Sequence, residues 1–288
     1  MTSPFRLTCV QVNAGNQMAA NIEAAAQLAR AAHGDGAYFI AFPECVAMME
    51  MGRDAVLAQA RPEETHPALA AICDLANDPK VWLLSGSLSV RLPGDKVANQ
   101  SFLIDSEGAI QARYYKIHVF DVDLEDGESY RESATYQPGA AAMLAKTPWG
   151  KLGMTVCYDL RFPQLYRDLA LAGAALLAVP SAFTRPTGQA HWEVLMRARA
   201  IENAAYVFAP AQRGETPPRP AYPWPFADRR SVGRRAGRWR RCAGPYHRRD
   251  QSRQGGRSPP LSTVADPRPT LPGPGLITAA VRLRSCHF

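Results

Sequence analysis

The chain has 288 residues, enough for one large domain or two small ones, and a formal net charge of +7 at neutral pH. Its six cysteines form no C-x-x-C pair and no spacing suited to zinc, and no apolar run reaches the roughly 20 residues of a membrane-spanning helix. No signal peptide opens the chain. These features argue against a membrane protein or a secreted disulfide scaffold and predict a soluble, cytoplasmic protein.

The positive charge is concentrated at one end of the chain. Residues 1–213 hold 18 Lys and Arg against 22 Asp and Glu, whereas residues 214–288 hold 15 Arg, no Lys and 4 acidic residues. Half of the prolines also fall in the second range. A basic tail of this kind is typical of nucleic-acid-binding arms, so composition alone leaves that function open.

Strand-like and helix-like segments alternate along the first range. This alternation indicates an α/β or a layered α+β domain, with a turn-rich stretch over 121–138. The predicted strands cover 5–12, 37–42, 81–90, 99–105, 109–115, 152–156, 175–180 and 206–210, and the predicted helices cover 16–33, 65–77, 163–172 and 191–202.

Two charged residues follow predicted strands. Glu44 lies at the carboxyl end of the strand over 37–42, where α/β sheets usually keep their active sites. It is either a solvated loop carboxylate or a general base. Lys116 follows the strand over 109–115 and is either a surface charge or a cation that stabilises an oxyanion and favours a thiolate.

Cys157 lies between the predicted strand over 152–156 and a helix that Pro163 is well placed to open. Such a strand-to-helix turn exposes the side chain at the end of a sheet and directs the next backbone N–H groups toward whatever the sulfur attacks. A buried structural cysteine is the alternative, because free cysteine is among the most buried residue types.

Three motifs together resemble a known family. Phe42-Pro-Glu44, Tyr115-Lys116-Ile-His and Val156-Cys157-Tyr-Asp-Leu-Arg-Phe-Pro163 occur in this order. With them, residues 5–213 resemble the nitrilase (carbon-nitrogen hydrolase) superfamily. The resemblance implies an α+β fold, a four-layer αββα sandwich, and a reaction that needs no metal or organic cofactor.

The resemblance also implies roles for the residues in these motifs. Glu44 is the general base, Cys157 the nucleophile, and Lys116 the cation that supports the tetrahedral intermediate together with the backbone N–H of Tyr158. The implied reaction hydrolyses an amide through a cysteine thioester with release of ammonia. The implied partners are a small-molecule amide and water, with neither nucleic acid nor membrane.

A supporting glutamate lies beyond the lysine in this family. Glu132, within Arg-Glu-Ser, matches its context best, and Glu128 is the alternative.

Later segments narrow the resemblance to one branch. Ser181-Ala-Phe-Thr, residues 187–202 and Ala209-Pro-Ala-Gln-Arg are most similar to the deaminated glutathione amidases, with the omega-amidases as close neighbours. Both act on small, acid-bearing amides, so a cation is expected near the pocket. Arg161 and Arg185 are the candidates, with a structural clamp as the alternative role.

Three further interpretations stay open. The chain could be an N-carbamoyl-amine hydrolase of the same superfamily or a catalytically impaired relative. His191 and Trp192 either begin a helix that packs on the core or line the pocket.

The resemblance stops after Arg213, where a proline-rich stretch follows that cannot fill a central sheet. Reading the degenerate codons of 219–234 from their second base permits G-R-R-T-H-G-H-S-L-I-V-D-P-W-G, the family's continuation, at every position. We infer a frameshift near 214–216. Residues 1–213 then form the hydrolase domain, and residues 214–288 are an out-of-frame, disordered Arg/Pro-rich tail whose charge is no evidence for nucleic-acid binding.

This departure has two consequences for the assembled protein. The sandwich is expected to be incomplete at its C-terminus. The homodimer that the family suggests would also lose a C-terminal segment that its members commonly use in dimer contacts.

Overall fold

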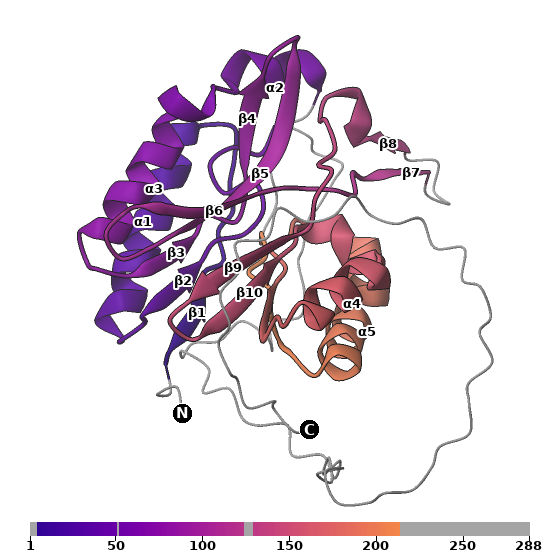
Figure 1. Ribbon diagram of the computed structural model, residues 1–288. Helices are drawn as coiled ribbons and strands as arrows, with labels where there is room; N and C mark the ends of the chain where they lie inside the picture. The colour runs from indigo at the N-terminus through magenta and orange to yellow at the C-terminus, as the bar shows by residue number, and fades with distance from the viewer. Residues whose placement is uncertain (1–4, 51, 124–128, 214–288) are drawn as a thin grey trace, which may run out of the picture.

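The computed structural model describes residues 5–50, 52–123 and 129–213. Two β-sheets pack face to face, and helices cover both outer faces (Figure 1). The predicted αββα sandwich of the α+β class is therefore confirmed. The tail predicted for 214–288 and the alternative glutamate, Glu128, lie outside the described residues.

The first sheet is formed by the N-terminal half of the chain. Its first three strands run parallel, and the rest pair antiparallel with the long central strand β5. The strands are β1 (Leu7–Cys9), β2 (Phe39–Ala41), β3 (Trp82–Leu84), β4 (Leu88–Leu92), β5 (Lys96–Ile104) and β6 (Ile110–Tyr115).

The strand predicted over 81–90 is divided into β3 and β4, which pair with successive parts of β5. Gly86 lies at the break with a φ of +70°, and a Cβ atom there would lie 1.9 Å from the carbonyl oxygen of Pro43. Only glycine fits this left-handed, closely approached position. The Oγ of Ser87 then accepts a hydrogen bond from the backbone N–H of Cys45 at 3.0 Å. The break therefore makes room for the segment after β2 that carries Glu44.

The second sheet follows in the chain. Its order is β12-β11-β10-β9, with β10, β11 and β12 parallel and β9 antiparallel to β10. A separate two-stranded hairpin lies in the stretch predicted to be rich in turns. These strands are β7 (Asp121–Asp123), β8 (Ser129–Arg131), β9 (Met143–Thr147), β10 (Gly150–Met154), β11 (Leu176–Ala178) and β12 (Tyr206–Phe208).

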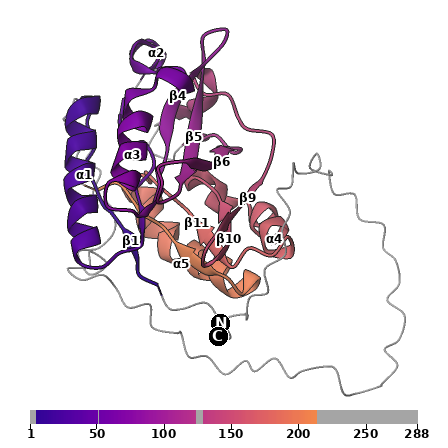
Figure 2. The same cartoon turned by 60° about the vertical axis from the view of Figure 1, so that its left-hand side comes forward.

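Helices form the two outer layers. Figure 2 shows α1 and α3 side by side along the first sheet, with α4 and α5 near the second. The helix predicted from His191 begins earlier, at Arg185, with a proline in its first turn, so His191 and Trp192 lie inside α5. The helices are α1 (Met18–Gly34), α2 (Arg53–Gln59), α3 (Pro67–Asn77), α4 (Pro163–Leu171) and α5 (Arg185–Asn203), with short 3-10 turns η1 (Glu63–Thr65), η2 (Glu132–Ala134) and η3 (Cys157–Arg161).

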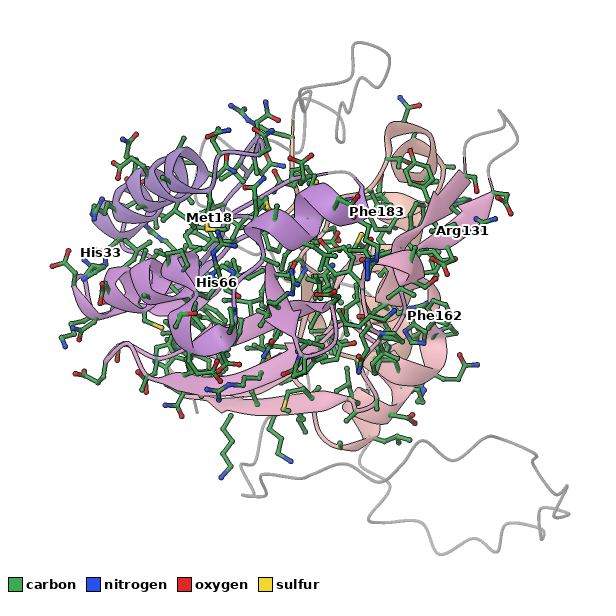
Figure 3. All side chains as sticks on the ribbon, turned by 90° about the horizontal axis from the view of Figure 1, so that it is seen from above. Met18, His33, His66, Arg131, Phe162 and Phe183 are labelled. Atoms are coloured by element: carbon green, nitrogen blue, oxygen red, sulfur yellow. The ribbon has the colours of Figure 1, made fainter. Side chains whose placement is uncertain are left out.

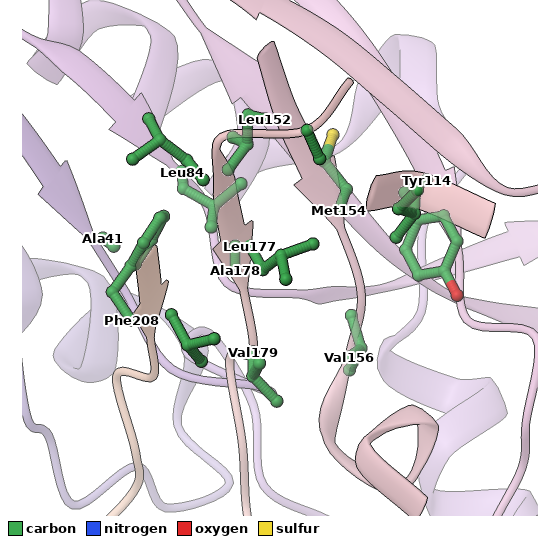
Figure 4. Close-up of a cluster of buried hydrophobic side chains, with 14 of the residues drawn as sticks. Ala41, Leu84, Tyr114, Leu152, Met154, Val156, Leu177, Ala178, Val179 and Phe208 are labelled. Atoms are coloured by element: carbon green, nitrogen blue, oxygen red, sulfur yellow. The ribbon is translucent and has the colours of Figure 1, made fainter. Parts of the chain in front are cut away.

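A buried apolar cluster joins the two sheets. Ala41, Leu84 and Tyr114 of the first sheet pack with side chains of the second, such as Met154 and Phe208 (Figure 4). A second cluster fills the space between the first sheet and its covering helices. Because this packing fixes both sheets, it also fixes the loops at their ends relative to one another. No helix in the described part of the chain is long and apolar enough to cross a lipid bilayer.

Candidate active site

The loops that follow β2, β6 and β10 meet at one cavity of about 380 Å³. Glu44, Lys116, Cys157 and Glu132 all line it, so the structure brings together four side chains that are far apart in the sequence. Glu44 and Lys116 are 4% and 3% exposed, which excludes the alternatives of a solvated loop carboxylate and a surface charge.

Lys116 is held between two carboxylates. Its Nζ lies 2.9 Å from Glu44 Oε1 and 2.9 Å from Glu132 Oε2. Burial disfavours the charged ammonium, but the negative charges of Glu132 and Glu44 outweigh this cost and raise the pKa of Lys116 well above its ordinary value. The two carboxylates therefore favour the charged form of Lys116, which lines the cavity.

Asn99 in β5 connects the two glutamates and was not identified from the sequence. Its Nδ2 donates to Glu44 Oε1 at 3.0 Å and to Glu132 Oε1 at 3.2 Å. The backbone N–H of Phe120 donates to Glu132 Oε2 at 2.6 Å. The available signal was a polar amide within a strand that is otherwise mostly apolar, since a buried amide needs polar partners.

Cys157 is the first residue of η3 and has a left-handed φ of +49°. The chain turns at this residue after leaving β10. The Glu44 carboxylate and the backbone of Ala182 lie close enough to its thiol to influence the pKa of Cys157. Burial, and then the negative charge of Glu44, raise the pKa of Cys157 well above its ordinary value, although Lys116 lowers it. The net effect favours the neutral thiol, which needs a base to become a nucleophile, while Lys116 itself acts in the expected direction, toward the thiolate.

The backbone N–H of Tyr158 lies between two N–H groups that are already engaged. Cys157 N donates to the carbonyl of Pro180 at 2.9 Å, and Asp159 N donates to that of Val156 at 3.1 Å. Across the described residues, no hydrogen bond uses the N–H of Tyr158. As the first turn of a helix leaves N–H groups unpaired, this one is available to an oxyanion beside the sulfur.

Arg161, one of the two predicted anion-binding residues, lines the same cavity. Its guanidinium lies 5.9 Å from the ring centre of Tyr158 and 5.5 Å from that of Phe183, and its NH1 lies 3.2 Å from Nδ1 of His191. In the described part of the chain, no carboxylate forms a salt bridge with Arg161. Arg185 begins α5, but its side chain lies outside the described ones.

Two other arginines at the cavity were not identified from the sequence. Arg131 makes a salt bridge with Asp123 at 2.7 Å, so its charge is already paired, and Figure 3 places it on the same side of the molecule as Phe183. Arg53 at the start of α2 donates to the carbonyl of Asp95 at 3.0 Å. Arg131 is part of the Arg-Glu-Ser context of Glu132, but that context assigns it no role, and Arg53 lies in no motif. Among the described residues, no group of three or more His, Cys, Asp or Glu could hold a metal ion.

Comparison with known proteins agrees with this geometry. The chain is 50% identical over 151 residues to the deaminated glutathione amidase of Yersinia enterocolitica. The aligned residues cover 51% of this chain and 53% of that protein. It is 35% identical over 206 residues to the omega-amidase of Danio rerio, covering 71% of this chain and 73% of that protein. The chain thus spans about half the length of the first relative and nearly three quarters of the second.

A solved structure and a family model place the fold. The structure of Saccharomyces cerevisiae Nit3, a member of the nitrilase superfamily, aligns with a TM-score of 0.67 at 28% identity, over 76% of this chain and 79% of that one. The model of the carbon-nitrogen hydrolase family matches residues 6–257. The observed αββα sandwich, with a glutamate, a lysine and a cysteine in one cavity, agrees with this similarity. The chain belongs to the carbon-nitrogen hydrolase family.

Proposed function

We propose that this protein hydrolyses the amide bond of a small, acid-bearing amide such as deaminated glutathione, through a thioester on Cys157. The convergence of Glu44, Lys116 and Cys157 in one cavity carries this proposal. The cavity, about 380 Å³, is of a size suited to a small metabolite. We also propose a cytoplasmic location, since the spacing of the cysteines resembles no disulfide framework.

Acylation begins with a proton transfer. The Glu44 carboxylate takes the proton of the Cys157 thiol, and the sulfur attacks the amide carbonyl carbon. The negative charge moves to the carbonyl oxygen, where the Lys116 ammonium and the N–H of Tyr158 stabilise it. When the carbon–nitrogen bond breaks, Glu44 returns the proton to the nitrogen, which leaves as ammonia from a primary amide or as an amine from a substituted one.

Deacylation repeats these steps with water. Glu44 takes a proton from a water molecule, whose oxygen attacks the thioester carbon, and the carbon–sulfur bond then breaks. The acid leaves, and the proton on Glu44 returns to the Cys157 sulfur. Glu132 holds Lys116 in place throughout, and Asn99 holds Glu44. The hydrogen bonds that these residues form in the structure support these roles.

The acidic group of the substrate is assigned to Arg161. Its guanidinium is oriented by two aromatic rings and by His191, so little conformational freedom is lost when a carboxylate binds. We expect Arg161→Gln to raise KM for an acid-bearing amide while leaving that for its uncharged analogue nearly unchanged. Arg131→Gln is the matched control, because that cavity arginine is already paired with Asp123.

The test is a pair of cysteine variants assayed for the acid and for ammonia or amine. Cys157→Ala should abolish product formation, whereas Cys45→Ala, which alters the other cavity cysteine, should leave a measurable rate. Turnover by Cys157→Ala at the unmodified protein's rate would exclude the proposal. If the unmodified chain is also inactive, the interpretation as a catalytically impaired relative holds instead.

Two related reactions are distinguished by their products and substrates. The similarity to the omega-amidase of Danio rerio makes a short 2-oxo-acid amide the second substrate to assay. Carbon dioxide released together with ammonia would instead identify an N-carbamoyl-amine hydrolase.

A further inference from the structure

Asp159 is a buried carboxylate that lies two residues after Cys157 and does not line the cavity. It is 0% exposed and accepts four hydrogen bonds. A carboxylate this deeply buried needs several donors to offset its loss of hydration. The origin of those donors indicates what the residue does.

Three of these four hydrogen bonds come from two residues of the segment that carries Lys116. The hydroxyl of Tyr114 donates to Asp159 Oδ2 at 2.7 Å, and the backbone N–H of His118 donates to Oδ1 at 3.0 Å. The His118 ring also meets Oδ1 through Nδ1 at 2.7 Å and stacks on Phe162 with ring centres 3.5 Å apart. Asp159 is thus bound to residues on both sides of Lys116.

Other contacts hold Asp159 to the turn that carries Cys157. The backbone N–H of Val156 donates to Asp159 Oδ2 at 2.8 Å, and that of Phe162 donates to the Asp159 carbonyl at 2.9 Å. A single side chain therefore spans two segments from different sheets, since Lys116 follows β6 and Cys157 follows β10. In addition to the packing of the two sheets, it directly links the strand ends that hold the cation and the sulfur.

We propose that Asp159 is a positioning residue that fixes the Lys116 ammonium relative to the Cys157 sulfur, acting through Tyr114 and His118. The inference rests on the proposed function for its kinetic consequence, but the geometry of the link is independent of it. Cation and nucleophile must lie at fixed places around the reacting carbon, because a displacement of about 1 Å can cost on the order of 100-fold in rate. A carboxylate shared by both segments supplies that rigidity.

Two buried tyrosines allow a matched test. Tyr114 donates its hydroxyl to Asp159, and Tyr166 forms a hydrogen bond with Thr155 Oγ1, each at 2.7 Å. Both are almost fully buried, at 1% and 0% exposure. Tyr114→Phe and Tyr166→Phe therefore each remove one buried hydroxyl near the same turn, but only Tyr114→Phe removes a hydrogen bond between Asp159 and the segment of Lys116, where the contacts of His118 remain.

The measurements are kcat, KM, the urea midpoint of unfolding and the pH dependence of Cys157 alkylation by iodoacetamide. Both variants should lower the urea midpoint, but only Tyr114→Phe should lower kcat, by about 10- to 100-fold with little change in KM. Its alkylation midpoint should also move to higher pH, because Lys116 lowers the pKa of Cys157 and would be held less closely. Alkylation needs no amide turnover, so it tests the link even if the proposed reaction is wrong.

A double-mutant cycle completes the test. Asp159→Asn should lower kcat at least as much as Tyr114→Phe, and the two changes together should cost less than the product of their separate effects. Equal losses of kcat and equal alkylation midpoints in the two tyrosine variants would overturn the proposal and leave Asp159 a structural residue. If Asp159→Asn does not fold, the comparison of the tyrosines still decides.

Discussion

Glu44 acts on Cys157 in two opposite ways, and a single substitution separates them. In the proposed mechanism it removes the thiol proton as a base, but its negative charge also raises the pKa of that thiol. In Glu44→Gln the base is lost, so kcat should fall by about 100- to 10,000-fold. The charge is lost as well, so the pH midpoint of Cys157 alkylation should move lower, although burial keeps it above that of an ordinary cysteine.

The control for this experiment is Glu50→Gln. Glu50 also lines the cavity and accepts a hydrogen bond from Gln59 at 3.4 Å, whereas the salt bridges of Lys116 within the described chain are with Glu44 and Glu132. Its substitution should change neither the alkylation midpoint nor kcat by more than a few fold. An unchanged midpoint in Glu44→Gln would show that the two groups are not coupled as the structure has them.

The individual residues of the site differ in how far sequence could predict them. Glu44, Lys116 and Cys157 follow strands and lie in recognisable motifs, so their meeting could be expected. Asn99 lies inside a strand, and Asp159 lies in the motif of Cys157, where the resemblance assigns it no role. The glutamates that Asn99 bonds are at least 33 residues away in the sequence, and the bonds from Tyr114 and His118 to Asp159 span at least 41 residues. Only the fold brings such distant residues together, so the sequence alone does not predict these pairs.

At the scale of elements, the break between β3 and β4 controls the position of Glu44. Gly86→Ala places a Cβ 1.9 Å from the Pro43 carbonyl oxygen, which the structure cannot accept without moving the segment of Glu44. Gly94 has a similar φ of +72° but open space around it. Gly94→Ala should cost about 1–2 kcal/mol of unfolding free energy from backbone strain, and Gly86→Ala about 1–3 kcal/mol more from overpacking.

The two alanine variants should therefore differ in activity as well as in stability. Gly86→Ala is expected to lose most of kcat because Glu44 is displaced, whereas Gly94→Ala should keep it. Urea unfolding and steady-state kinetics measure both quantities. Normal kcat in a folded Gly86→Ala protein would mean that the segment after β2 tolerates the shift.

The same break shows why some elements escaped prediction. The mostly apolar run over 81–90 predicts one strand. The break at Gly86 is not visible in the sequence, because it is caused by the close approach of Pro43 from another part of the chain. Periodic segments were placed well: the helix predicted over 16–33 is α1, Met18–Gly34. β7 and β8 have three residues each and a mostly exposed, polar pattern, so they carry no hydrophobic signal.

At the scale of the whole molecule, the last described residues are bonded to the segment that carries Glu44. Gln212 Nε2 donates to the carbonyl of Glu44 at 2.9 Å, and Gln212 Oε1 accepts from the N–H of Ala14 at 3.0 Å. Arg213 N donates to the carbonyl of Val12 at 2.8 Å. The last of the described residues therefore lie beside the backbone of Glu44.

The frameshift hypothesis can be tested through this connection. Within the described residues β12 is an edge strand that pairs with β11 alone, so the second sheet could be extended there. A gene with the reading frame changed after Arg213, so that G-R-R-T-H-G-H-S-L-I-V-D-P-W-G is encoded, should give a protein with a melting temperature at least about 5 °C higher. Its kcat should also rise, because the backbone of Glu44 would be held more firmly.

Three proteins should be compared by thermal unfolding and amidase assay: the printed chain, the frame-restored chain and a chain ending at Arg213. If the printed tail contributes nothing to stability or activity, the printed chain and the chain ending at Arg213 will have the same melting temperature and kcat. The frame-restored chain will then have higher values of both. A restored chain that is no more stable than the printed one would contradict the frameshift, because a native C-terminal segment must bury apolar surface against the core to belong to it. The printed sequence of 214–288 would then be the protein's own.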